Sequence, residues 1–95
     1  MKSDESHLDD LRRDIDEVDR EILRLLARRM QLVLQVGDYK RKHALAVYDP
    51  ERERRMLEQL ANSSTAPLTA ESAKRIFERL IDESRSLEQR HVNEK

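Results

Sequence analysis

The sequence predicts an all-α protein in which one very long helix is followed by two shorter helices. Only one glycine and two prolines interrupt the 95 residues, and aromatic residues make up only 3%. Charged residues account for 41% of the chain and apolar residues for 37%, a balance typical of long amphipathic helices. We expect one helical domain over residues 8–90, between a disordered N-terminal tail (1–7) and a short C-terminal tail (91–95).

The composition also excludes several classes of protein. Without cysteine, the chain has neither a disulfide framework nor a cysteine-based metal site or nucleophile. A net charge of -1 creates no overall field toward nucleic acid or an anionic membrane. No apolar stretch approaches the roughly 18 residues of a membrane span, and the first residues (MKSDESH) lack the apolar segment of a signal peptide. We therefore expect a cytoplasmic protein without a cofactor, a bound metal, a nucleic-acid partner or a membrane partner.

The long helix is predicted from Leu8 to about Lys42, a stretch without proline. Its apolar residues recur at spacings of three and four and form a seam of Leu8, Leu11, Ile15, Val18, Ile22, Leu25, Leu32 and Val36. At about 1.5 Å per residue, the helix would be roughly 50 Å long, which exceeds the width of a compact domain of this size. One chain cannot bury this seam, so we expect an intertwined homodimeric helical bundle in which the long helices pair.

The two shorter helices have recognisable starts. Asp49 is expected to cap the second helix, with Pro50 at its first position. The apolar stripe of this helix consists of Met56, Leu57 and Leu60. The segment 62–68 (NSSTAPL) breaks the chain, and Thr69 is the expected N-cap of the third helix. The inner face of the third helix is predicted to carry Ala73, Ile76, Phe77, Leu80, Ile81 and Leu87.

Polar side chains interrupt the apolar faces of all three predicted helices. Arg29 continues the seam of the long helix, and Lys40, eleven residues later, returns to within about 20° of the same face. Glu53 on the second helix, and Ser84 and Glu88 on the third, also lie on inward faces. Because an unpaired buried charge costs several kcal/mol, carboxylates or a ligand should lie opposite the two cations.

Two interpretations of these polar residues remain open. They could form internal salt bridges or reach water, with Ser84 bonding a backbone carbonyl and Glu88 facing solvent or pairing with Arg85. Alternatively, they line a polar pocket inside a helical bundle. Arginine, lysine, glutamate and serine suit a small polyanion, or a reaction that needs only positioning and electrostatic stabilisation. The sequence offers no phosphate-binding loop, metal cluster or nucleophile with its base.

Four segments follow one another in a distinctive order: LDDLRRDIDEVDREILRLLARR, VGDYKRKH, YDPERER and IFERLIDESRSLEQ. In this order and spacing, from Leu8 to Gln89, the chain resembles the all-helical class of chorismate mutase. The resemblance implies an intertwined dimer that converts chorismate to prephenate in phenylalanine and tyrosine biosynthesis. It assigns eight residues to the active site: Arg12, Arg29, Lys40, Asp49, Arg52, Glu53, Ser84 and Glu88.

The resemblance also implies a role for each of these residues. Arg12 and Arg29 would pair with the two substrate carboxylates, and Lys40 would bond a carboxylate and the ether oxygen. Arg29, Lys40 and Glu88 are the expected catalytic residues, and the remaining five bind substrate.

On the other side of the substrate, Glu53 and the backbone near Asp49 would hold the ring hydroxyl. Ser84 would contact a carboxylate, and Arg52 would belong to the network beside Asp49. Glu88 departs from the glutamine of much-studied bacterial members, which donates a hydrogen bond to the ether oxygen. Because an ionised carboxylate cannot donate, Glu88 would have to be protonated to act in this way.

Helix geometry limits where Arg12 can act. Seventeen residues separate it from Arg29, which on a straight helix means about 25 Å along the axis and about 260° around it. The two arginines cannot share a pocket within one chain. If both bind one substrate, Arg12 must come from the partner chain, and each site spans the dimer interface.

Other functions on the same scaffold remain open. An isochorismate pyruvate lyase and a 4-amino-4-deoxychorismate mutase are the enzyme alternatives. The segment YDPERE favours the ordinary mutase because it places Asp49, Arg52 and Glu53 where a ring hydroxyl is expected. The non-enzyme alternative is a helical module that binds an aromatic metabolite or regulates a larger enzyme, and a partner enzyme of the same pathway is also conceivable.

Overall fold

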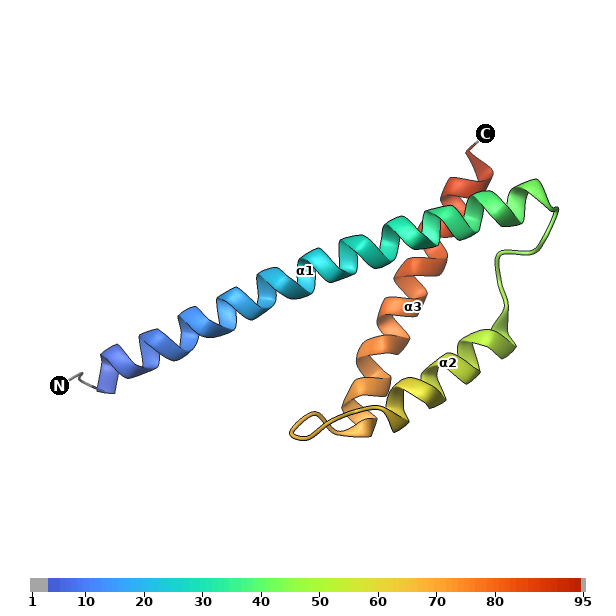
Figure 1. The fold of residues 1–95 in the computed structure, drawn as a ribbon. Helices are drawn as coiled ribbons and strands as arrows, with labels where there is room; N and C mark the ends of the chain where they lie inside the picture. The colour runs from blue at the N-terminus through green and yellow to red at the C-terminus, as the bar shows by residue number, and fades with distance from the viewer. Residues whose placement is uncertain (1–3, 95) are drawn as a thin grey trace. The chain divides into compact units, whose positions relative to one another are not determined.

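The computed structural model describes residues 4–94, which form three α-helices and no β-strand. Helix α1 comprises Asp4–Lys42, α2 comprises Pro50–Asn62 and α3 comprises Ala70–Asn93 (Figure 1). The all-α prediction is therefore confirmed. The chain divides into two compact units, Met1–Gln31 and Leu32–Lys95, and α1 contributes to both. Within the described part of the chain, no helix combines the length and apolar character needed to cross a bilayer.

Two helices extend into the segments predicted as tails. Helix α1 begins at Asp4 rather than Leu8, and Asp4 and Glu5 place negative charge in its first turn, where it complements the helix dipole. Helix α3 continues to Asn93. Residues 1–3 of the predicted N-terminal tail and residue 95 of the C-terminal tail lie outside the described residues.

Helix α1 ends where the backbone adopts a left-handed conformation. Ala44 has φ 54°, and the backbone N–H of Leu45 donates to the carbonyl of Lys40 at 2.7 Å. A left-handed residue just after the last turn is a common helix terminator because it lets the next N–H groups satisfy the final carbonyls. The chain then leads through Val47, which is buried, to the start of α2.

The predicted caps of α2 and α3 are both confirmed. The carboxylate of Asp49 accepts a hydrogen bond from the backbone N–H of Arg52 at 3.2 Å, and Pro50 is the first residue of α2. The hydroxyl oxygen of Thr69 accepts from the backbone N–H of Ser72 at 3.1 Å. Each cap satisfies an N–H group that has no partner within its helix, which fixes where the helix starts.

The core of the second unit lies between α2 and α3, which pack against each other. Its buried apolar residues are Val47, Ala73 and Ile81. The predicted stripes of α2 and α3 are otherwise half-buried, at Met56, Leu57, Leu60, Phe77, Leu80 and Leu87. Ile76 was predicted on the inner face but is 57% exposed. It lies at the edge of the stripe, about 140° around the helix from Ile81, so only part of its side chain can reach the core.

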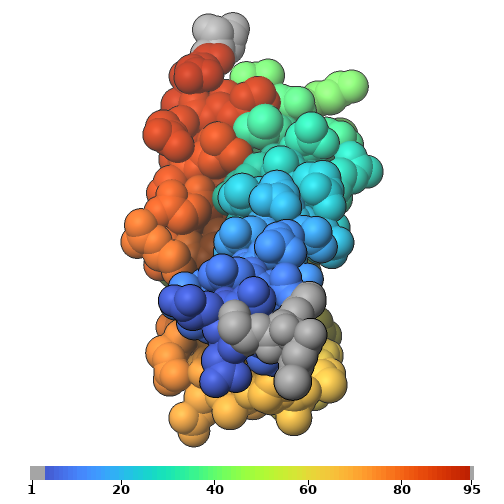
Figure 2. Space-filling view, turned by 90° about the vertical axis from the view of Figure 1, so that its left-hand side faces the viewer, coloured from blue at the N-terminus to red at the C-terminus, as the bar shows by residue number. Residues whose placement is uncertain are grey.

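The C-terminal end of α1 approaches α3 closely at Gly37, the only buried residue of α1. A Cβ atom at this position would lie 3.2 Å from Cγ of Glu88 and 3.3 Å from Cγ2 of Val92. One residue further, Oδ1 of Asp38 lies 2.7 Å from Nε2 of His91. Figure 2 shows the green end of α1 beside the red end of α3. Glycine therefore lets the two helices come this close, whereas any Cβ atom here would require the side chains of Glu88 and Val92 to shift.

The apolar seam of α1 is exposed along its whole length. Its exposed fractions range from 43 to 70% at Leu8, Leu11, Ile15, Val18, Ile22, Leu25, Leu32 and Val36. A soluble monomer rarely leaves so long an apolar stripe in contact with water.

We expect that Gly37→Val lowers the free energy of unfolding by about 1–3 kcal/mol, because its branched side chain would collide with α3. Urea denaturation followed by circular dichroism measures this change. Gln35→Val is the matched control, since it places the same side chain on an exposed position of the same helix. Equal effects of the two substitutions would show that the close approach at Gly37 does not matter for stability.

Candidate active site

The most sheltered charges in the second unit belong to Lys40 and Glu88. Lys40 lies in the last turn of α1, and Glu88 lies on the buried face of α3. Their Nζ and Oε2 atoms are 3.0 Å apart, and the side chains are only 19% and 10% exposed. The expectation that a carboxylate faces Lys40 is confirmed. The alternatives in which Glu88 faces solvent or pairs with Arg85 are wrong, because the C-terminal end of α1 covers Glu88.

Lys40 makes a second contact that fixes it in place. Its ammonium donates a hydrogen bond to the carbonyl oxygen of Val47 at 2.8 Å, which ties α1 to the segment that leads into α2. Oε2 of Glu88, by contrast, is buried without a hydrogen-bond partner, so it pairs with Lys40 by charge and distance rather than by an aligned hydrogen bond. This oxygen can accept a proton or a donor group from a ligand.

A second pair of charges connects α2 to α3. Nε and Nη2 of Arg85 donate to Oε2 and Oε1 of Glu53, both at 2.8 Å, in the bidentate arrangement that makes arginine–carboxylate pairs strong. The guanidinium also lies 5.0 Å from the ring centroid of Tyr48. Hydrogen bonding to Glu53 raises the pKa of Arg85 above its ordinary value, so the arginine stays charged.

Arg85 is a residue that the sequence analysis did not place in the site. Its position next to Ser84 was visible in the sequence, and so was its possible pairing with Asp82 within the same helix. Its tertiary partner Glu53 is 32 residues away, and no local pattern connects the two.

The predicted residues Asp49, Arg52 and Ser84 also lie in the second unit. The carboxylate of Asp49 is engaged as the cap of α2, and Arg52 is exposed one turn later. Ser84 is buried, and its hydroxyl donates to the carbonyl of Leu80 at 2.7 Å, as the alternative interpretation expected. Ser84 lies one turn before Glu88 on the same face of α3, so the two polar groups extend one stripe.

The two remaining predicted residues, Arg12 and Arg29, lie on the part of α1 that belongs to the first unit. Arg12 is exposed and Arg29 is half-buried. The structure therefore brings together Lys40 with Glu88 and adds Arg85 as the partner of Glu53. Arg12 and Arg29 belong to the first unit.

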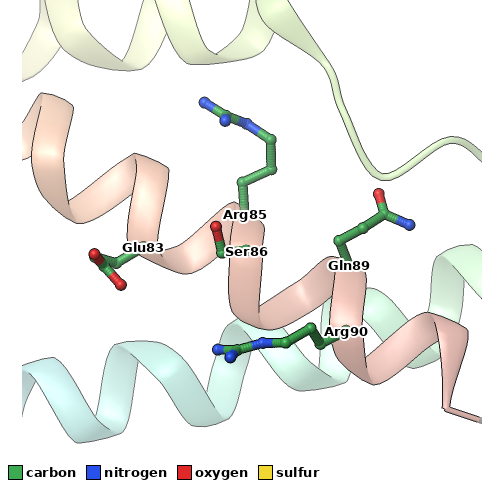
Figure 3. A pocket seen from close by; sticks show the side chains of 5 residues that line it. All are labelled: Glu83, Arg85, Ser86, Gln89 and Arg90. Atoms are coloured by element: carbon green, nitrogen blue, oxygen red, sulfur yellow. The ribbon is translucent and has the colours of Figure 1, made fainter.

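An open depression of about 610 Å³ lies along α3. Figure 3 shows the side chains that line it, with Arg85 and Arg90 leaving the helix in different directions: Glu83, Arg85, Ser86, Gln89 and Arg90. None of the eight predicted site residues lines this depression. We place the candidate active site at Lys40, Glu88 and Glu53 instead, because their side chains are only 10 to 20% exposed. The depression meets this site only at Arg85, which pairs with Glu53.

Comparison with known proteins identifies the family of this chain. The family model described as chorismate mutase type II matches residues 11–89. The T-protein of Haemophilus influenzae is 41% identical over 78 residues, which is 81% of this chain and 21% of the relative. The chain spans only 13 to 21% of the length of this and similar curated relatives, which include bifunctional chorismate mutase/prephenate dehydratases.

Two solved structures match over almost their whole length. Chorismate mutase (form II) from Thermus thermophilus has a TM-score of 0.85 and 37% identity, covering 88% of this chain and 96% of that one. Chorismate mutase from Helicobacter pylori in complex with prephenate has a TM-score of 0.85 and 27% identity, covering 95% and 98%. With both its sequence and its three-helix fold matched, the chain belongs to the chorismate mutase type II family.

Proposed function

We propose that this chain catalyses the rearrangement of chorismate to prephenate. The observation that supports this most directly is the sheltered pair of Lys40 and Glu88, whose polar atoms are 3.0 Å apart. Two groups this close can both reach a single ligand oxygen. The family match and the prephenate bound to the Helicobacter pylori relative supply the substrate class.

The reaction needs positioning and charge stabilisation rather than a base or a nucleophile. It is a concerted shift in which the ether C–O bond breaks as a C–C bond forms, so no cofactor is required. We propose that Arg12 and Arg29 anchor the two carboxylates and hold the enolpyruvyl arm over the ring. Lys40 and a protonated Glu88 then stabilise the negative charge that grows on the ether oxygen.

The opposite side of the substrate would meet the start of α2. We propose that Glu53 accepts a hydrogen bond from the ring hydroxyl, together with the backbone near Asp49. Arg52 supports this network from the first turn of α2, and Ser84 contacts a carboxylate. Glu53 is suited to this role because its side chain is only 20% exposed and its orientation is fixed by Arg85.

We propose that the site is completed by a second copy of the chain. The apolar seam of α1 is exposed in the single chain. Pairing the α1 helices of two chains would bury both seams. Because Arg12 and Arg29 of one chain cannot share a pocket, we propose that the Arg12 that meets the same substrate as Arg29 comes from the partner chain. Dimerisation would be a condition of activity, not only of stability.

We also propose that this protein is cytoplasmic and that it acts beside another enzyme of the same pathway. Some curated relatives are named as chorismate mutases joined to prephenate dehydratase. A prephenate-consuming enzyme is therefore the expected neighbour in the pathway of this chain.

We expect the purified protein to deplete chorismate and produce prephenate. Lys40→Ala should lower turnover by at least about a hundredfold, because one preorganised donor is worth roughly 3 to 4 kcal/mol in the transition state. The loss of chorismate absorbance with prephenate appearing measures both results. Lys42→Ala is the matched control, since it removes an exposed lysine from the same turn of α1.

Other outcomes of this assay would contradict the proposal. A loss below tenfold in Lys40→Ala would remove Lys40 from the mechanism. Parallel incubations with isochorismate and with 4-amino-4-deoxychorismate identify the two enzyme alternatives. A folded chain that binds chorismate without converting it would support a binding or regulatory module instead.

We expect activity to fall as the pH rises, because the proposed role of Glu88 requires a protonated carboxyl group and an ionised carboxylate cannot donate a hydrogen bond. Glu88→Gln should flatten this profile, since an amide donates at every pH of the assay. Turnover of both proteins measured across the pH range tests this. Identical profiles would show that Glu88 is not the donor.

We expect two inactive variants to restore activity when their subunits mix. A heterodimer of an Arg12→Ala chain and a Lys40→Ala chain contains one site with both residues intact. Activity of the mixture, compared with each variant alone, measures the recovery. Subunit exchange is followed by native mass spectrometry, and exchange without recovered activity would contradict the shared site.

A further inference from the structure

Arg85 contacts three side chains: Glu53, Asp82 and Tyr48. Its Nε and Nη2 atoms donate to the two oxygens of Glu53, and Nη2 also lies 2.9 Å from Oδ1 of Asp82. Its guanidinium lies 5.0 Å from the ring centroid of Tyr48, at a distance where a cation is attracted to an aromatic face. Glu53 is thereby fixed from α3, although it belongs to α2.

The pair leaves room for a ligand on Glu53. A carboxylate has about four lone-pair positions, two on each oxygen. Arg85 takes one position on each oxygen of Glu53, so each oxygen can accept one further hydrogen bond. A ring hydroxyl can therefore bind to Glu53 without displacing Arg85.

Arg85 also compensates the negative charge of Glu53. A substrate with two carboxylates would be repelled by an uncompensated carboxylate at Glu53, and sheltered groups are poorly screened by water. With Arg85 bound, Arg85 and Glu53 together carry no net charge, and the acceptor oxygens of Glu53 remain in place. The Asp82 carboxylate that also contacts Arg85 is 60% exposed, so water and salt screen its charge.

We propose that Arg85 is a positioning residue that orients Glu53 and neutralises its charge, so that a dianionic substrate can place its ring hydroxyl on this carboxylate. The proposal rests on the proposed function and assigns a role to a residue outside the eight predicted ones. Arg85 itself need not touch the substrate, because it acts through Glu53.

The test is a comparison of kinetic constants. We expect Arg85→Met to raise KM for chorismate about tenfold with kcat changed less than about threefold, since repulsion acts on bound substrate and transition state alike. Adding Glu53→Gln to this variant should lower KM again by about threefold or more, because the amide removes the charge but keeps an acceptor oxygen. A merely structural role of Arg85 would not produce this recovery.

Arg79→Met is the matched control. It makes the same substitution on the same helix but breaks the exposed pair with Glu83, so KM and kcat should stay at the parent values. Arg85→Lys covers the case in which Arg85→Met does not fold. It keeps the charge but loses the bidentate geometry, and we expect KM to rise by about threefold.

The possible failures are distinguishable. A parent chain that does not convert chorismate overturns the proposed function, and the role of Arg85 falls with it. An active parent together with an unchanged KM in Arg85→Met and Arg85→Lys overturns only the role of Arg85. So does a double variant with Glu53→Gln that binds chorismate no better than Arg85→Met alone.

Discussion

A charged group that folding removes from water must be given a partner, and this constraint organises the second unit. Its buried apolar core is small, with Val47, Ala73 and Ile81 as its only members among the described residues. Two ion pairs between helices supplement this core, from α1 to α3 at Lys40 and from α2 to α3 at Glu53. The residues proposed to meet the substrate therefore also hold the helices together.

Helix α3 is the element on which both pairs depend. It supplies one partner of each pair from neighbouring turns, with Arg85 facing α2 and Glu88 facing α1. Gly37 allows α1 to approach this helix, and the cap at Thr69 sets where the helix begins. A rotation of α3 would move both charges together, so its packing controls the shape of the candidate site.

Local features of the fold were predictable from the sequence, because a cap involves side chains and backbone only three residues apart. The inward direction of Lys40 and Glu88 also followed from helical periodicity. Their pairing with each other did not, because 48 positions of chain separate residue 40 from residue 88 and pairing depends on how the helices pack. The same limit explains the wrong placement of Ile76 and the missed partner of Glu53, since periodicity gives a face but not what covers it.

The hydrogen bond from Lys40 to Val47 has a consequence for affinity. A free lysine side chain samples many rotamers, and ordering it costs up to about 2 kcal/mol of conformational entropy. In this chain, that ordering takes place during folding, since the carbonyl of Val47 accepts a hydrogen bond from the ammonium at 2.8 Å. An arriving anion meets a cation that is already immobilised, and more of their mutual attraction is retained as net binding free energy.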